Sequence, residues 1–141
     1  MQLAVMTNSK GHRDLIVYQK AFALAMKIYL VTKKFPKEEI YSLVDQIRRS
    51  SRSVCSCIAE AYRKRKYQGY FINKISDADG ENSETIVWLE FSEACGYISS
   101  EEKTELELLA EEVGRMISSM LTNPDKFLPK GKQEIEKKIG K

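Results

Sequence analysis

The sequence predicts an all-α protein folded as an antiparallel up-down-up-down four-helix bundle, and three observations lead to this prediction. Apolar residues recur at spacings of three and four over four long segments, which is the period of an α-helix. Glycine and proline are scarce, with seven and three residues in 141, and this scarcity favours long helices over many-turned β structure. The connections between the four segments are short, which places consecutive helices antiparallel.

The first helix is predicted to follow Asp14, whose carboxylate is expected to cap its N-terminus. Two adjacent apolar stripes then predict that this helix packs against more than one neighbour. The stripes are Val17, Ala21, Leu24, Ile28 and Val31, and Tyr18, Phe22, Ala25, Tyr29 and Thr32. We expect the helix to end near Phe35, because Pro36 disfavours helical geometry in the residue before it.

The second helix is predicted to begin between Pro36 and Tyr41 and to end near Lys66, before a break at Gly69. Its core stripe is Leu43, Ile47, Ser50, Val54, Cys57 and Ala61. The third helix is predicted over residues 70–95, with an unusually polar stretch at 77–84 that should line a loosely packed core. Gly96 is expected to end it in a left-handed conformation.

The fourth helix opens with Ser99 and Glu102 in capping-box spacing and is expected to close at Asn123 and Pro124. A single domain at 14–123 is therefore predicted, preceded by a mobile lead at 1–13. The C-terminal tail at 124–141 is rich in lysine and is expected to be disordered.

Charge is distributed unevenly along the chain, although the formal net charge is only +3. Residues 48–66 carry seven cations and one acid, whereas residues 77–112 carry twelve acids and one lysine. Such a charge separation predicts an anionic partner, or assembly with further copies of the chain.

Several classes of protein are disfavoured by the sequence. No apolar run approaches the ~20 residues of a membrane span, and the N-terminus does not resemble a secretion signal, so a cytoplasmic protein without membrane contact is expected. The three cysteines predict free thiols, with Cys57 and Cys95 at or beside core positions. Cys55 and Cys57 point in nearly opposite directions on a helix and cannot easily share a metal ion. We expect no catalytic residue, metal or cofactor, because the only histidine, His12, lies outside the bundle.

The cations of the second helix are the candidate functional residues, in two groups. Arg48, Arg49 and Arg52 share a face, and for them pairing with the acidic helices of a neighbouring copy is slightly favoured. The run from Arg63 to Lys66, namely Arg63, Lys64, Arg65 and Lys66, ends the helix beside Tyr67 and Tyr70. Phosphate binding by these four cations, with bases stacked on the two tyrosines, is slightly favoured over a purely structural role at the helix end.

Several motifs together resemble a known family. They are DLIVYQKAFALA at 14–25, FPKEEIYSL at 35–43, QIRRSSRSV at 46–54, IAEAYRK at 58–64, Gly80 with Glu84, and CGYIS at 95–99. The chain resembles the ribosomal-protein-like four-helix bundles, some of whose genes lie within intervening sequences of 23S rRNA genes. In that family a proline usually stands where this chain has Cys55, so a straighter second helix is expected here. The resemblance implies a homopentameric ring, a fold shared with a nucleic-acid-binding accessory protein, and no established enzymatic activity.

Two functions remain open from the sequence. The first is a non-enzymatic accessory protein that binds nucleic acid, preferentially RNA but with DNA not excluded, through the basic surface of a homo-oligomeric ring. The second is a structural or adaptor oligomer whose charge asymmetry serves self-assembly and a protein partner. They differ in whether the cations stay exposed after assembly or are consumed at subunit interfaces.

Overall fold

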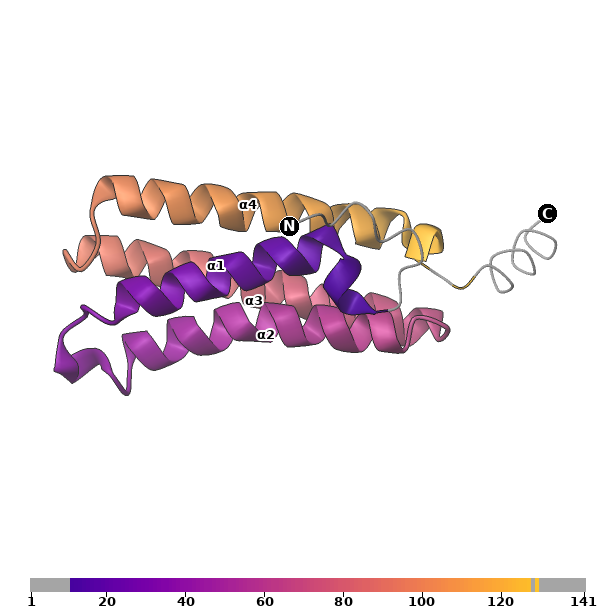
Figure 1. The fold of residues 1–141 in the computed structure, drawn as a ribbon, viewed down its shortest axis with the longest axis horizontal. Helices are drawn as coiled ribbons and strands as arrows, with labels where there is room; N and C mark the ends of the chain where they lie inside the picture. The colour runs from indigo at the N-terminus through magenta and orange to yellow at the C-terminus, as the bar shows by residue number, and fades with distance from the viewer. Residues whose placement is uncertain (1–10, 128, 130–141) are drawn as a thin grey trace.

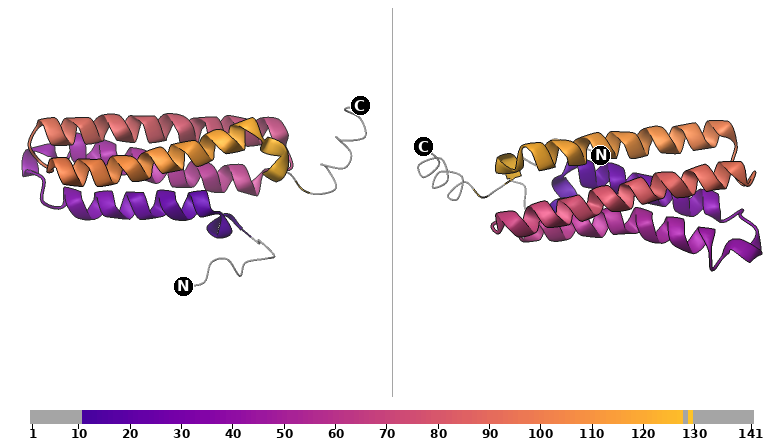
Figure 2. Two further views of the ribbon diagram at one scale, coloured as in Figure 1. Left: turned by 90° about the horizontal axis from the view of Figure 1, so that it is seen from above. Right: turned by 180° about the vertical axis from the view of Figure 1, so that it is seen from behind.

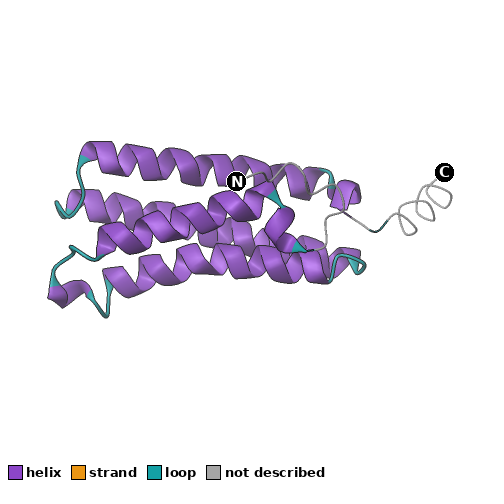
Figure 3. Ribbon diagram, viewed as in Figure 1, coloured by secondary structure: helices purple, strands orange, loops and turns teal. Residues whose placement is uncertain are grey.

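The computed structural model describes residues 11–127 and 129, and within them four long helices form the predicted antiparallel bundle (Figure 1). The helices are α1 (Ile16–Thr32), α2 (Leu43–Arg63), α3 (Gln68–Ala94) and α4 (Ser100–Thr122). Short 3-10 helices are η1 (His12–Asp14), η2 (Lys37–Glu39) and η3 (Pro124–Phe127). No strand occurs in the described part of the chain (Figure 3), so the all-α prediction is confirmed.

Several helix boundaries differ from the predicted ones. Asp14 does not cap α1, because it lies inside η1 and Leu15 takes the N-cap position without a side-chain hydrogen bond. The segment expected to start the second helix folds instead as η2, and α2 begins at Leu43. At its far end α2 stops at Arg63, and α3 starts at Gln68, so the break precedes Gly69. Polar side chains and a proline near these ends compete locally with helical hydrogen bonding.

The predicted ends of the last connection are confirmed. Gly96 follows α3 with φ +79°, the left-handed conformation that glycine adopts most easily. Ser99 Oγ accepts a hydrogen bond from the Glu102 amide, and the Glu102 carboxylate accepts one from the Ser99 amide. This capping box satisfies two backbone amides at the start of α4.

The predicted terminal segments lie largely outside the described residues. Residues 11–13, at the end of the expected lead, belong in part to η1, where His12 contacts Tyr18 with ring centroids 4.6 Å apart. At the other end, Phe127 of η3 stacks on Phe71 with a centroid distance of 5.9 Å. Both ends of the described chain therefore pack on the same end of the bundle (Figure 1).

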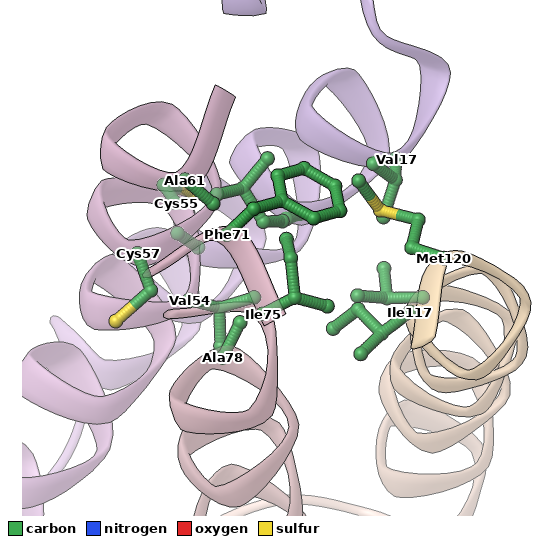
Figure 4. Packing of buried hydrophobic residues seen from close by; sticks show 14 residues of the cluster. Val17, Val54, Cys55, Cys57, Ala61, Phe71, Ile75, Ala78, Ile117 and Met120 are labelled. Atoms are coloured by element: carbon green, nitrogen blue, oxygen red, sulfur yellow. The ribbon is translucent and has the colours of Figure 1, made fainter. Parts of the chain in front are cut away.

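The apolar core consists of two clusters placed end to end along the bundle. One surrounds Phe71 and Ile75 of α3 and receives Ile117 and Met120 from α4 (Figure 4). The other lies nearer the α1–α2 and α3–α4 connections and includes Leu24, Ile47 and Leu106. Burial of side chains of this size stabilises the fold by about 1.5–3 kcal/mol each.

A polar layer separates the two clusters, at the level of the polar stretch of α3. Ser50 and Thr85 share a hydrogen bond of 2.8 Å between buried hydroxyls. Asn82 Nδ2 donates to the Ala110 carbonyl at 2.9 Å, while Asn82 Oδ1 has no partner among the described residues. The helix continues through Gly80 without a break. The polar stretch therefore contributes specific interior hydrogen bonds, and these fix how α3 faces α2 and α4.

Helix α1 packs on α2 and α4 and leaves one long side uncovered (Figure 2). Its residues include only two charged side chains, Lys20 and Lys27, and its outer side exposes Phe22, Met26 and Leu30. A helix that is apolar on nearly all sides is typically covered on nearly all sides. The outer side of α1 is therefore a candidate contact surface.

Candidate nucleic-acid interface

The seven predicted cations lie on α2 and on the turn that follows it, and α2 runs unbroken through Cys55. At about 100° per residue, Arg48, Arg52 and Arg63 fall within about 60° of one another around the helix axis. Arg52 and Arg63 are about 16 Å apart along that axis. The structure therefore places the two groups on a common side of α2 but at opposite ends of it.

Arg48 is bound to the C-terminal end of α1. Its Nε donates to Thr32 Oγ1 at 2.9 Å, and a terminal nitrogen donates to the Tyr29 carbonyl at 3.4 Å. Its guanidinium also lies 4.7 Å from the centroid of the Tyr29 ring. A cation here compensates the partial negative charge of the last carbonyls of α1. Arg48 thus joins α1 to α2 within one copy, whereas its pairing with the acidic helices of a neighbouring copy stays a prediction.

The other two arginines of this group keep more of their surface in solvent. Arg49 forms an ion pair with Asp45 at 3.0 Å, one helical turn earlier. Arg52 lies 5.8 Å from the Tyr29 ring centroid and, like Arg48, forms no ion pair with a carboxylate of the described chain. Exposed pairs such as Arg49 with Asp45 contribute about 0–1 kcal/mol, so Arg49 is available to an anionic ligand at little cost.

These arginines line an open groove of about 940 Å³ between the end of α1, η2 and the first half of α2. Lys33 and Lys37 add two more cations to it, and Asp45 is the one acid that lines it among the described residues. Neither lysine was predicted as a site residue from the sequence, because neither lies on α2. The turn after α1 brings these lysines close to the arginines of the groove, and a turn leaves no periodic pattern in the sequence. The excess of cations over acids in this groove is typical of a surface that binds anions.

The second group lies around the turn between α2 and α3. Arg65 donates to the Tyr62 carbonyl at 2.9 Å, and its guanidinium stacks 4.0 Å from the Tyr62 ring centroid. Lys64 lies 5.2 Å from the Tyr70 ring centroid, and Tyr70 donates to Glu60 at 3.2 Å. Desolvation, followed by this hydrogen bond, raises the pKa of Tyr70.

A second groove, of about 520 Å³, brings together Arg63, Lys64, Arg65 and Tyr70. Arg13 of η1 also lines it and was missed from the sequence, where it lay in the predicted lead. Lys66 and Tyr67 are not part of this lining, although the Lys66 ammonium lies 5.1 Å from the Tyr67 ring centroid. Within the part of the chain that the structure describes, Glu60 is the only acid that lines this groove.

The acids of α4 are occupied elsewhere in the bundle. Lys20, Lys27 and Lys34 of the first helix and its C-terminal turn bind Glu112, Glu105 and Glu102, at 3.1, 3.1 and 2.7 Å. Within one copy, therefore, Glu102, Glu105 and Glu112 of α4 are paired with these lysines rather than with the arginines of α2. The basic side of α2 remains directed outward.

One cysteine differs from its predicted placement: Cys95 is exposed after the end of α3, not in the core. Cys55 and Cys57 point in nearly opposite directions, as predicted, and both are buried, Cys55 against α1 and Cys57 towards α3. The described residues contain no group of three His, Cys, Asp or Glu side chains able to hold a metal ion. Across the described part of the chain, no helix is long and apolar enough to span a membrane.

Comparisons with known proteins were made for sequence and for fold. Residues 13–119 match the model of a family described as 23S rRNA-intervening sequence protein. A solved structure from Bacteroides thetaiotaomicron VPI-5482, described as a protein of unknown function from the S23 ribosomal protein family, is similar at 27% identity and a TM-score of 0.69. The match covers 76% of this chain and 96% of that one. No curated protein matches. Because the family model spans most of the chain, this protein belongs to the 23S rRNA-intervening sequence protein family.

Proposed function

We propose that this protein is a non-enzymatic accessory protein that binds nucleic acid, with RNA as the preferred class, through the basic side of α2. The observation that carries the proposal is the outward direction of these cations: three acids of α4 bind lysines of the first helix and its C-terminal turn instead. The family description, which names an intervening sequence of 23S rRNA, accords with RNA as the ligand.

Phosphate groups are the anions that such grooves suit. Each cation that neutralises a phosphate releases counterions, and for single strands it adds about 0.7 to the slope of log affinity against log salt. Individually these contacts are weak. A homo-oligomeric ring, expected to be a pentamer, would repeat both grooves several times and so multiply the contacts available to one RNA molecule.

The test replaces Arg63, Lys64, Arg65 and Lys66 together by Gln. We expect weaker RNA binding and a salt slope smaller by up to about 3, because four phosphate contacts are removed. The matched control replaces four other cations by Gln, namely Lys20, Lys27, Lys74 and Lys103, which are paired with acids. This control variant lowers the net charge by the same amount, but its slope of log affinity against log salt should equal that of the wild type. Identical slopes for both quadruple variants would place the site elsewhere.

A second function is favoured by one observation. Large apolar side chains are exposed on α1, α3 and α4, with Leu30 and Leu108 each 60% exposed and Phe91 52% exposed. Such side chains are typical of contact surfaces between protein chains. In this alternative the protein is a structural or adaptor oligomer with a protein partner. Nucleic acid in the purified protein, measured as excess absorbance at 260 nm, favours the first function. Absence of RNA binding by the wild type at low salt favours the second.

A further inference from the structure

The two basic grooves are parts of one continuous depression along the seam between α1 and α2. A third, smaller groove of about 350 Å³ lies between them. It shares Arg52 and Ser56 with the first basic groove and Ala59 with the second. The short side chains Ser56 and Ala59 leave the seam open where α2 passes from one basic group to the other. We call the joined depression the α1–α2 furrow; Arg48 and Arg63 are about 22 Å apart along it.

The two ends of the furrow are strongly cationic. Among the described residues, nine lysine and arginine side chains line it, against the two carboxylates of Asp45 and Glu60. Arg13, Lys33 and Lys37 come from η1, the end of α1 and η2, so the positive charge is not confined to α2. A charge excess of this size along an open groove is suited to the backbone of a polyanion.

The middle of the furrow is apolar and partly aromatic. Tyr18 and Phe22 of α1 lie there with ring centroids 6.1 Å apart, next to Met26. Phe22 is 50% exposed. This exposure is unfavourable, because the apolar surface of the ring stays in contact with water. Arg52 belongs to the same stretch of lining. An exposed ring beside an arginine offers a flat surface on which a nucleobase can stack.

We propose that the α1–α2 furrow binds single-stranded nucleic acid, with phosphates at its two cationic ends and an unpaired base stacked on Phe22 between them. This inference rests on the proposed function and specifies its substrate class. A duplex keeps its base faces stacked on one another, so it can use the cationic ends but not the apolar middle. A single strand can use both the cationic ends and the apolar middle, because its bases can turn away from the backbone.

Charge complementarity favours this occupant over a second copy of the chain. An acidic helix of another copy would also meet the cations. However, three of the α4 acids that could supply that charge, Glu112, Glu105 and Glu102, are already bound to Lys20, Lys27 and Lys34. A phosphate backbone brings one negative charge per nucleotide and competes with the exposed pair of Arg49 and Asp45, which costs little to displace. Docking of a second copy is accordingly the alternative that the experiment must separate.

The experiment compares Phe22→Ala with Phe91→Ala. Phe91 is the matched control, because it is 52% exposed on α3, beside Trp88 and away from the furrow. Binding is measured by fluorescence anisotropy with a short single-stranded RNA, the single-stranded DNA of the same sequence, and the RNA duplex, over a range of salt. Thermal unfolding and light scattering are recorded for each variant.

We expect the wild type to bind both single strands more tightly than the duplex. Phe22→Ala should weaken single-strand binding by about 5- to 150-fold, as expected for loss of one stacked base. Its salt slope should stay unchanged, because Phe22 contacts no phosphate. Phe22→Trp should retain wild-type affinity, and Phe91→Ala should behave as the wild type does. Duplex binding should be the same for all variants.

Other outcomes overturn the inference in distinguishable ways. Equal binding of single strands and duplex, or an unchanged affinity for Phe22→Ala, removes the stacking site but leaves the proposed function standing. No binding of any probe by the wild type overturns both. A smaller molar mass for Phe22→Ala, with Phe91→Ala unaffected, shows instead that the furrow is a contact between copies.

Discussion

Cys55 and Cys57 show how two neighbouring residues meet different surroundings. Residues two apart on a helix differ by about 200° in direction, and α2 has a packed neighbour on both sides. Cys55 therefore lies against α1, and burial raises its pKa to about 11. Burial also raises the pKa of Cys57; the positive charge of Lys74 opposes that rise, whereas the negative charges of Asp77, Glu81 and Glu60 add to it. The rise is larger at Cys55, so a negative charge is more unfavourable there.

The first prediction concerns these two cysteines. Cys55→Asp should lower the free energy of unfolding by roughly 3 kcal/mol or more, because it buries a carboxylate without a partner. Cys57→Asp should cost less, since the pKa of Cys57 is raised less than that of Cys55 and Lys74 partly opposes the rise. This reverses the order expected from helix periodicity alone. Urea unfolding followed by circular dichroism measures both, with the exposed Cys95→Asp as control. A larger loss at Cys57 would show that Lys74 gives no compensation.

At the scale of the elements, one carboxylate joins three segments at the end of the bundle. Glu39 of η2 accepts hydrogen bonds from Ser42 Oγ at 2.6 Å and from the Leu43 amide at 3.2 Å. Its other oxygen accepts one from the Tyr97 hydroxyl at 2.8 Å. The bond from Ser42, followed by those from Tyr97 and Leu43, lowers the pKa of Glu39 below its ordinary value of 4.5. The same contact raises the pKa of Tyr97 to about 12.

The second prediction follows from the lowered pKa of Glu39. A carboxyl whose pKa is lower in the folded state stabilises the fold above its unfolded pKa, and this contribution is lost as pH falls through the folded value. Glu39→Gln should therefore lower the melting temperature at pH 7 and reduce its fall between about pH 5 and pH 2. Melting curves over this range measure the effect. Glu38→Gln, an exposed neighbour, is the control, and equal pH profiles for both variants would contradict the role of Glu39.

The third prediction concerns two glycines inside helices. An added Cβ at Gly80 of α3 meets nothing within 4 Å, so Gly80→Ala should stabilise the protein by about 0.5–1 kcal/mol. At Gly114 of α4 the Cβ would lie 3.3 Å from Asn82 Nδ2, which is buried and bound to the Ala110 carbonyl. Gly114→Ala should therefore stabilise the protein less than Gly80→Ala does, or destabilise it. Chemical unfolding measures both.

A double-mutant cycle checks the cause. In an Asn82→Ala background the contact is absent, and Gly114→Ala should recover the gain seen at Gly80. If Gly114→Ala has the same effect with and without Asn82, the close contact is not what limits it.

For the whole molecule, assembly remains a prediction. Leu30 of α1, which does not line the furrow, and the exposed apolar residues of α3 and α4 predict that copies associate, with a pentamer expected. Light scattering at micromolar concentration should give a mass several times 16.2 kDa. Part of the assembly should weaken between about 0.15 and 1 M salt, because the screening length falls from about 8 to 3 Å. A 16.2 kDa monomer at every salt concentration would exclude the ring.

The four helices, their antiparallel order and the sharp ends at Gly96 and Ser99 could be predicted from the sequence. Helical periodicity, a capping box and a left-handed glycine are properties of a continuous stretch of chain, so they can be read without knowing the neighbours. The shared face of Arg48, Arg49 and Arg52 was predicted in the same way.

The surroundings of these residues depend on the tertiary structure and could not be predicted from the sequence. The binding of Arg48 to Thr32, the burial of Cys55 and the polar contact of Asn82 depend on how helices distant in sequence are rotated towards one another. The furrow likewise needs Arg13 and Lys37, which lie in short 3-10 segments whose placement has no periodic signal. Helix periodicity gives the direction of a side chain around its own axis. The packing of the bundle decides whether that direction leads to solvent, to a groove or to another helix.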